Sequence, residues 1–144
     1  MQLPIWQPFI DEWYTFALFL LFIFILIGIS EFAQSILRWN PEFSRKLVHL
    51  VVGTIVSACP FIFKSNIPPI LLAGIFIFIN ALALKTDKFK GIHSTDRFSY
   101  GTVYFPIAFL ILALFWWEKP ITLILSMLIM TFSDTIAAVI GERT

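Results

Sequence analysis

Five long apolar stretches divide the sequence and constrain its fold more than any other feature. They cover residues 13–30, 47–63, 70–84, 100–117 and 121–141. Their lengths approach the roughly 20 residues that a helix needs to cross the hydrocarbon core of a bilayer. Hydrophobic residues form 59% of the chain, which exceeds their usual share in soluble domains. We therefore expect an all-α fold, a polytopic transmembrane helical bundle with about five membrane helices in one domain.

Polar segments and prolines set the boundaries of these stretches. Residues 1–12 form a short polar lead. Asn40-Pro41 predicts a turn in the first connector, residues 31–46. Pro60 predicts a bend near the end of the second stretch, because proline cannot donate the backbone hydrogen bond that continues a helix.

The basic residues are unevenly divided between the two ends of the predicted bundle. Because successive helices alternate in direction, one end receives Arg38, Arg45, Lys46, Lys85, Lys88, Lys90, Arg97 and Arg143. The other end receives only Lys64 and Lys119, and the Trp116-Trp117 pair there suits a membrane interface. The positive-inside rule predicts an integral, multi-pass protein whose N-terminus lies outside and whose active face is cytoplasmic.

Polar side chains inside the apolar stretches gather toward the predicted cytoplasmic end. One helical face, with a spacing of three or four residues, holds Arg45, Lys46, His49, Gly53 and Ser57. The same end also holds Asn80, Arg97, Tyr100, Ser133, Asp134, Gly141 and Glu142. A structural protein has no need of this bias, whereas a membrane enzyme that joins a cytosolic polar substrate to a lipid does.

Asp134 lies inside the last apolar stretch. A carboxylate at such a depth costs about 2.5–3.5 kcal/mol on insertion scales, so we expect it to have a partner or a function. The small residues Ala137, Ala138 and Gly141 follow at helical spacing. A face of small residues lets another backbone or a bound ligand come close, and Gly141 is therefore a candidate phosphate-binding position.

These groups suit phosphoryl or nucleotidyl transfer. Cationic side chains for a nucleoside triphosphate are available at Arg45, Lys46, Arg97 and Arg143. Mg²⁺ prefers carboxylate and water ligands, so we expect Asp134 to bind it with help from Glu142. We expect His49 and Asp134 to be catalytic, with His49 orienting a phosphate oxygen or an attacking hydroxyl. Supporting polar groups are expected at Asn80, Tyr100 and Ser133.

Simpler interpretations exist for the same residues. Arg45 and Lys46 suit anchors that extend to lipid headgroups. His49 suits a hydrogen bond between helices, and Asp134 suits a structural ion pair with Arg45, Arg97 or His49. The run from Lys85 to Lys90 suits a solvated connector. The net charge of +1 identifies no partner, and we expect no nucleic acid among the partners.

Three short motifs resemble one enzyme family. The segment S-R-K-L-V-H-L-V-V-G, residues 44–53, resembles the R-K-x-x-H segment of the polyprenol kinase family. That family includes dolichol kinase, phytol kinase and CTP-dependent diacylglycerol kinase. R-F-S-Y-G-T-V-Y-F-P, residues 97–106, is similar to its Y-G segment. D-T-I-A-A-V-I-G, residues 134–141, resembles its D-x-x-A-x-x-x-G signature, which is related to a motif of phosphatidate cytidylyltransferases.

The resemblance implies a CTP-dependent lipid kinase that uses Mg²⁺ and phosphorylates a polyprenol, a phytol-like alcohol or a diacylglycerol. The family pattern continues beyond Thr144 with another Gly and Lys and further helices, so we expect this sequence to be C-terminally incomplete. Two alternatives stay open. One is a phosphatidate cytidylyltransferase that makes CDP-diacylglycerol. The other is a transporter or assembly protein without enzymatic activity.

Overall fold

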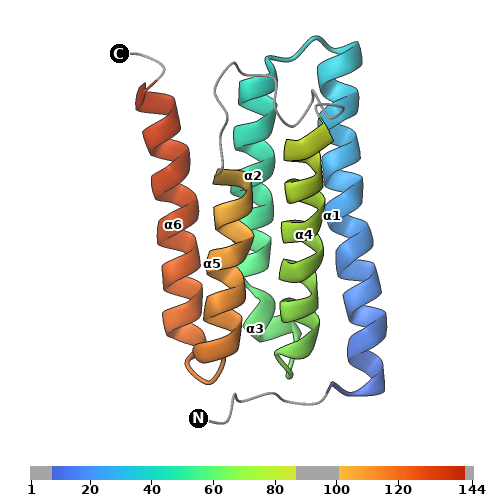
Figure 1. Ribbon diagram of the computed structural model, residues 1–144, viewed down its shortest axis with the longest axis vertical. Helices are drawn as coiled ribbons and strands as arrows, with labels where there is room; N and C mark the ends of the chain where they lie inside the picture. The colour runs from blue at the N-terminus through green and yellow to red at the C-terminus, as the bar shows by residue number, and fades with distance from the viewer. Residues whose placement is uncertain (1–7, 87–100, 142–144) are drawn as a thin grey trace.

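The computed structural model describes residues 8–86 and 101–141, and this part of the chain is helical without strands. Its helices are α1 (Ile10–Ile36), α2 (Pro41–Ser57), α3 (Cys59–Ile62), α4 (Ile67–Thr86), α5 (Gly101–Phe115) and α6 (Pro120–Gly141). The five long helices run side by side along the length of the molecule (Figure 1). The all-α expectation is confirmed for the described residues.

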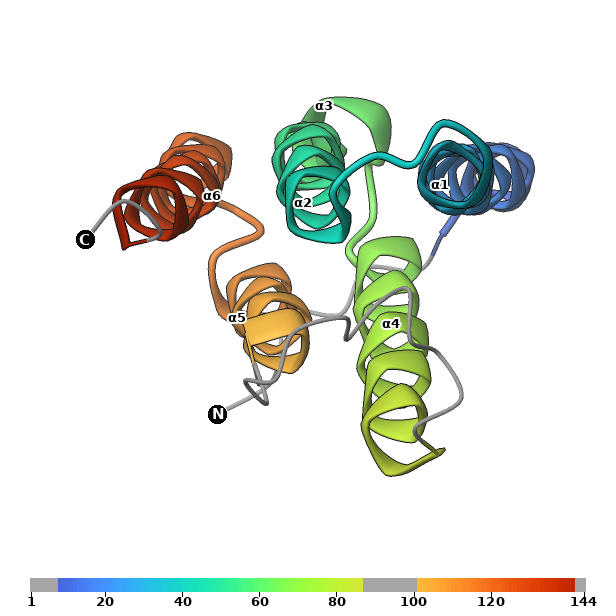
Figure 2. The same ribbon diagram turned by 90° about the horizontal axis from the view of Figure 1, so that it is seen from above.

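The long helices form two layers. Seen from above, α6, α2 and α1 lie in one row, with α2 in the middle, and α4 and α5 lie beside that row (Figure 2). The most extensive packing joins α4 to α5 and α2 to α6, followed by α1 to α2. Because α1, α4 and α6 run opposite to α2 and α5, one end of the bundle collects the ends of three helices and the starts of two (Figure 1).

Most of the expected connector at residues 31–46 is helical. The first helix continues to Ile36, and the second begins at Pro41, where proline suits a first helical position. The turn between them contains Arg38 in the left-handed region, at φ 52°, and Trp39 N–H donates back to Ala33 O at 3.4 Å. A turn at Asn40-Pro41 was expected, and the turn lies at residues 37–40, directly before Pro41. The helices around it are longer than hydropathy suggested. Polar residues such as Glu and Gln have a good helix propensity although they do not favour insertion into a membrane.

The bend expected at Pro60 is present. Helix α2 ends at Ser57, and Pro60 lies in the first turn of the short helix α3. Around this break Ala58 N–H donates to Ile55 O at 3.1 Å, a bond to the third preceding residue. Proline has no N–H and its ring collides with the carbonyl four residues earlier, so the helix cannot continue through it.

Two described helices, α1 and α6, are long and apolar enough to cross a bilayer. Shorter apolar helical stretches cover Ile67–Leu82 and Val103–Phe115. Large exposed side chains, among them Phe22 and Ile29 on α1 and Leu125 and Ile129 on α6, leave the outer faces apolar. These features hint at membrane association. The five-span topology and its orientation stay predictions.

The end of the bundle near Lys64 is tied together by hydrogen bonds. Glu12 is 6% exposed, and its Oε1 accepts from the backbone N–H of Lys64 at 2.5 Å and of Ser65 at 2.9 Å. Its Oε2 accepts from Phe9 N–H at 2.9 Å, which caps the first turn of α1. Glu12, expected in a polar lead, is therefore a buried residue of α1 that fixes the turn between α3 and α4.

Helix α5 and its following turn hold the same segment from the other layer. Asn66 Nδ2 donates to Ala113 O at 3.3 Å, and Trp117 Nε1 donates to Lys64 O at 3.3 Å. Trp117 is buried, whereas Trp116 is 40% exposed, so only Trp116 has the exposure expected of an interfacial residue. We call the group Glu12, Lys64, Ser65, Asn66 and Trp117 the closed end.

Candidate functional site

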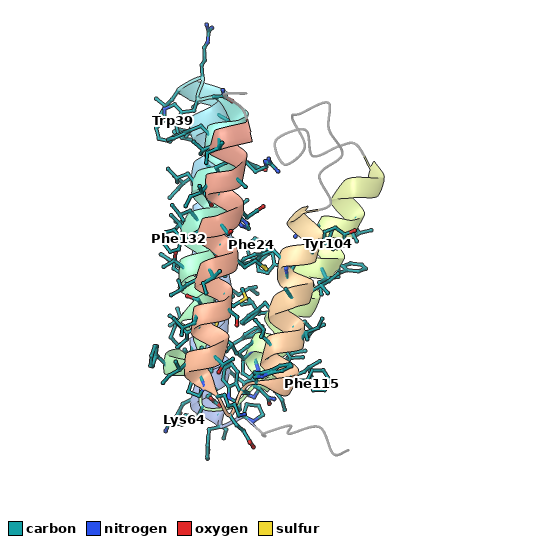
Figure 3. All side chains as sticks on the ribbon, turned by 90° about the vertical axis from the view of Figure 1, so that its left-hand side faces the viewer. Phe24, Trp39, Lys64, Tyr104, Phe115 and Phe132 are labelled. Carbon is teal, nitrogen blue, oxygen red and sulfur yellow. The ribbon has the colours of Figure 1, made fainter. Side chains whose placement is uncertain are left out.

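A pocket of about 370 Å³ lies between the two layers, and all five long helices line it. The layers are close together near Lys64 and diverge toward the end that carries Trp39 (Figure 3). The polar lining residues lie toward that diverging end, where α1, α4 and α6 finish and α2 and α5 begin. The pocket is therefore polar at the end of the bundle opposite to the closed end.

Nine polar side chains line this part of the pocket: Ser30, Glu31 and Gln34 on α1, Arg45, Lys46 and His49 on α2, Asn80 on α4, and Asp134 and Thr135 on α6. Arg45 and Lys46 are half-buried, so part of each long side chain remains accessible. We call these nine residues the polar mouth. Cations and carboxylates come together here from three helices, α1, α2 and α6, and α4 adds the amide of Asn80.

The imidazole of His49 lies at the centre of the polar mouth. Its Nε2 is 3.2 Å from Asp134 Oδ2, without the alignment of a hydrogen bond. The His49 side chain is 23% exposed and that of Asp134 is 65% exposed. The ring of Phe105 meets the imidazole edge to face, with centroids 4.6 Å apart. Three helices, α2, α5 and α6, thus fix the imidazole beside an accessible carboxylate.

Gly53, one turn beyond His49, allows α2 and α6 to approach. A Cβ at this position would lie 2.5 Å from Thr131 Oγ1 and 3.1 Å from Phe105 Cζ. The distance to Thr131 is far inside van der Waals contact and that to Phe105 is tight, so only glycine fits without a shift of the neighbouring helices. The close approach at Gly53 brings the α6 carboxylate within reach of His49.

The remaining half of the pocket is apolar. Ile23 and Ile27 contribute from α1, Val52 and Val56 from α2, and Leu72, Ala73 and Phe76 from α4. The side chains of Phe105, Pro106 and Phe109 complete the wall from α5. A pocket that is polar at one end and apolar at the other suits an amphiphile, with its polar group at the mouth and its hydrocarbon part inside.

The predicted site residues separate into three groups. Arg45, Lys46, His49, Asn80 and Asp134 come together in the polar mouth. Arg97, Tyr100, Glu142 and Arg143 lie outside the described residues.

The third group lies away from the pocket. Ser133 is exposed and does not line it. Gly141 is exposed, with open space where a Cβ would lie. Ser57, on the predicted polar face of α2, is buried and donates to Thr54 O at 2.6 Å, which accounts for its hydroxyl. Within the described structure these three residues do not contribute to the polar mouth.

Four residues of the polar mouth were not expected from the sequence: Ser30, Glu31, Gln34 and Thr135. Ser30 was assigned to the end of an apolar stretch, and Glu31 and Gln34 were assigned to the connector that follows it. Their offsets, with Gln34 three residues after Glu31 and four after Ser30, match one helical face and would have indicated a continued helix. Thr135 carried no signal beyond its position next to Asp134.

The carboxylate of Asp134 has the chemistry that the predicted magnesium ion prefers. Mg²⁺ keeps several waters and is held at nucleotide sites by one or two carboxylates together with phosphate oxygens. Asp134 is accessible and lies on the same pocket as Arg45 and Lys46, which suit phosphate. Among residues 8–86 and 101–141, no three His, Cys, Asp or Glu side chains gather as a metal cage. A site in which the nucleotide supplies most ligands needs no such cage.

No family model, no curated protein and no solved structure matches this chain. The pocket and the residues that line it are therefore the basis for a functional proposal.

Proposed function

We propose that the protein is a CTP-dependent lipid kinase that transfers the γ-phosphate of CTP to the hydroxyl of a membrane lipid alcohol. The observation that carries this proposal is the pocket itself. Its polar mouth combines two cations with the His49–Asp134 pair, and its interior is apolar. A kinase of this kind must bring a polyanionic donor and a lipid hydroxyl together at one boundary between polar and apolar surroundings.

Arg45 and Lys46 would bind the phosphates of the donor. They are adjacent on α2, both line the mouth, and His49 follows one turn later on the same face. An Arg guanidinium offers several donors in a fixed fork, whereas a Lys ammonium acts as a point charge. Catalysis of phosphoryl transfer is mostly positioning and charge stabilisation, so two cationic side chains can bind and position the phosphates of CTP.

The His49–Asp134 pair would act on the acceptor hydroxyl. The hydroxyl oxygen forms a bond to the γ-phosphorus, the bond from that phosphorus to the bridging oxygen of the β-phosphate breaks, and CDP leaves. The proton of the hydroxyl would pass to Nε2 of His49, which lies 3.2 Å from Asp134 Oδ2, and the carboxylate would stabilise the imidazolium that forms. Mg²⁺, when bound at Asp134 with the nucleotide, neutralises charge on the phosphates.

The motif resemblance supports the same activity and also supports a second candidate. D-T-I-A-A-V-I-G, residues 134–141, is related to a motif of phosphatidate cytidylyltransferases, which would use the same nucleotide and metal and release pyrophosphate. A transporter or assembly protein would also have a use for an amphiphile pocket, but it would transfer no part of the nucleotide.

Two labelled nucleotides separate these candidates. The full chain in lipid nanodiscs is incubated with Mg²⁺, a polyprenol, phytol or diacylglycerol, and CTP labelled at either the γ- or the α-phosphorus. We expect the lipid to become labelled only from γ-labelled CTP, and we expect CDP to form as the second product. With phosphatidate, transfer of the α-label and release of pyrophosphate would establish the cytidylyltransferase instead. Transfer of neither label would contradict both enzymatic candidates.

A further inference from the structure

The polarity of the pocket changes in the same direction on three of its helices. On α2 the lining side chains pass from Arg45 and His49 to Val52 and Val56. These four residues are three or four positions apart, so they form one continuous stripe. At a rise of 1.5 Å per residue, the seven residues from His49 to Val56 span about 10 Å along the helix axis.

Helices α1 and α4 repeat this change, although both run opposite to α2 (Figure 1). Their polar lining residues, Glu31 on α1 and Asn80 on α4, lie at the mouth. Their apolar lining residues, Ile23 and Leu72, lie toward the closed end. The eight residues between Asn80 and Leu72 span about 12 Å. On all three helices the lining residues thus change from polar to fully apolar over about 10–12 Å.

The pocket ends at a buried floor. Its residues are 0–5% exposed and line the pocket: Ile23, Val56, Leu72, Ala73 and Phe109. They belong to the same core as Cys59, Phe63 and Ala113, which do not line the pocket and are 0%, 2% and 0% exposed. A chain that enters from the polar mouth therefore meets closely packed side chains instead of a passage through the bundle.

We infer that the pocket holds a single hydrocarbon chain, and that Val56, Leu72, Ala73 and Phe109 limit the length that fits below the reacting hydroxyl. This inference rests on the proposed function, because the hydroxyl is placed at His49 and Asp134. The pocket volume, about 370 Å³, is near the lower end of the range of about 300–1,000 Å³ for small-molecule sites. One chain fits such a volume better than the two chains of a diacylglycerol, and a depth of about 10–12 Å favours a short lipid alcohol over a polyprenol.

Depth-resolved photolabelling tests the inference without any transfer reaction. Primary alcohols with a diazirine at successive carbons are incorporated into nanodiscs with the full chain, irradiated, and the labelled residues are identified by mass spectrometry. We expect carbons near the hydroxyl to label the level of Val52 and Phe76, and carbons about 10 Å away to label Leu72 or Phe109. An unlabelled alcohol should compete with both. Label confined to lipid-facing residues such as Phe22 and Leu125 would overturn the inference.

Two variants should move the length limit in opposite directions. Ala73→Leu adds volume at the floor and should weaken binding of the longest well-bound alcohol by about tenfold, because overpacking a filled site is unfavourable. Val56→Ala removes volume there and should extend the preference to longer alcohols. Ala17→Leu is the matched control, since Ala17 is exposed and away from the pocket. Competition against a photolabelled alcohol measures all three, and the same length preference in every variant would overturn the inference.

The outcomes also separate this inference from the proposed kinase activity. Label at the floor without any transfer from CTP supports the chain-binding pocket and contradicts the proposed function. Transfer from CTP with label only on the outer faces supports the kinase and contradicts the pocket as its lipid site. Ala73→Leu could unfold the protein, but Val56→Ala and the photolabelling of the unmodified chain still test the length limit.

Discussion

The two ends of the bundle place their polar side chains in different surroundings. At the closed end, the Glu12 carboxylate accepts three backbone N–H groups, and Asn66 and Trp117 each donate to a backbone carbonyl. At the polar mouth, side chains from four helices face a pocket, and His49 meets Asp134 without an aligned hydrogen bond. Polar groups paired with backbone hold the helices together at the closed end, whereas those of the polar mouth surround a cavity and are available to a ligand.

This difference means that mutations at the two ends should affect different measurements. A buried donor or acceptor that loses its partner costs about 1–3 kcal/mol, so changes at the closed end should lower stability. A group at the polar mouth is partly accessible and is arranged around a cavity. Its removal should lower activity and leave the folded state almost unchanged.

Asp134→Asn should have the largest effect on activity. The amide keeps the shape of the side chain but loses the charge beside His49, so proton transfer and metal binding both weaken. We expect transfer from CTP to fall about 10²-fold to 10⁴-fold, the range for loss of a general acid–base group. The thermal midpoint in detergent should not decrease, because the carboxylate is 65% exposed and has no aligned hydrogen bond to His49.

A Mg²⁺ titration accompanies this assay. Unchanged activity with an unchanged Mg²⁺ requirement would show that Asp134 is not the metal ligand. Loss of folding together with activity would favour the structural ion pair with His49 instead.

Glu12→Ala should have the largest effect on stability. Truncation leaves the N–H groups of Phe9, Lys64 and Ser65 without their acceptor. The Ser65 bond is buried, and the Phe9 and Lys64 bonds are part-buried and contribute less each. At about 1–3 kcal/mol for a buried unpaired group, we expect a total loss of about 3 kcal/mol. Urea or thermal unfolding of the purified protein measures it. Activity per folded molecule should stay within about twofold, and a selective loss of activity at full stability would contradict the division between the two ends.

The sequence predicted the helical class and much of the polar mouth because both depend on local patterns. Arg45, Lys46 and His49 share a face by spacing alone, and Asp134 is conspicuous inside an apolar stretch. Ser133 was grouped with Asp134 by adjacency, yet successive helical residues are about 100° apart. Asp134 lines the pocket, and Ser133 is exposed and does not.

The rest depended on contacts between distant segments. Glu12 and Lys64 are 52 residues apart, and nothing near Glu12 distinguishes a buried clamp from a polar lead. Glu31 and Gln34 were assigned to a connector because hydropathy marks only where a sequence is apolar. A helix can continue past that point as long as its backbone hydrogen bonds can form. Arg97, Tyr100, Glu142 and Arg143 fall outside the described residues, so their predicted roles stay predictions.

Gly53→Ala should lower both stability and activity by an intermediate amount. The new Cβ would collide with Thr131 on α6 and approach Phe105 on α5, so the helices must separate. Overpacking of this kind costs about 1–3 kcal/mol, and the shift also moves Asp134 relative to His49.

Gly74→Ala is the matched control, because Gly74 is also helical but has no heavy atom within 4 Å of its Cβ position. It should be neutral or stabilising by up to about 1 kcal/mol. Equal effects of the two changes on unfolding and transfer would contradict the close approach at Gly53.

Lys46→Ala and Lys64→Ala form the smallest and most direct comparison of the two ends. Lys46 lines the polar mouth, whereas Lys64 joins the closed end through its backbone N–H and C=O. The Lys64 ammonium lies 5.8 Å from the centre of the Phe9 ring, a contact that contributes little at an exposed site. One charge pair in water-like surroundings is worth about 1 kcal/mol, so Lys46→Ala should raise the KM for CTP about fivefold. Lys64→Ala should leave that KM unchanged, and both proteins should unfold near the parent temperature. If both substitutions raise the KM equally, long-range charge explains the effect. If neither does, Lys46 is an anchor at the membrane surface and not a phosphate ligand.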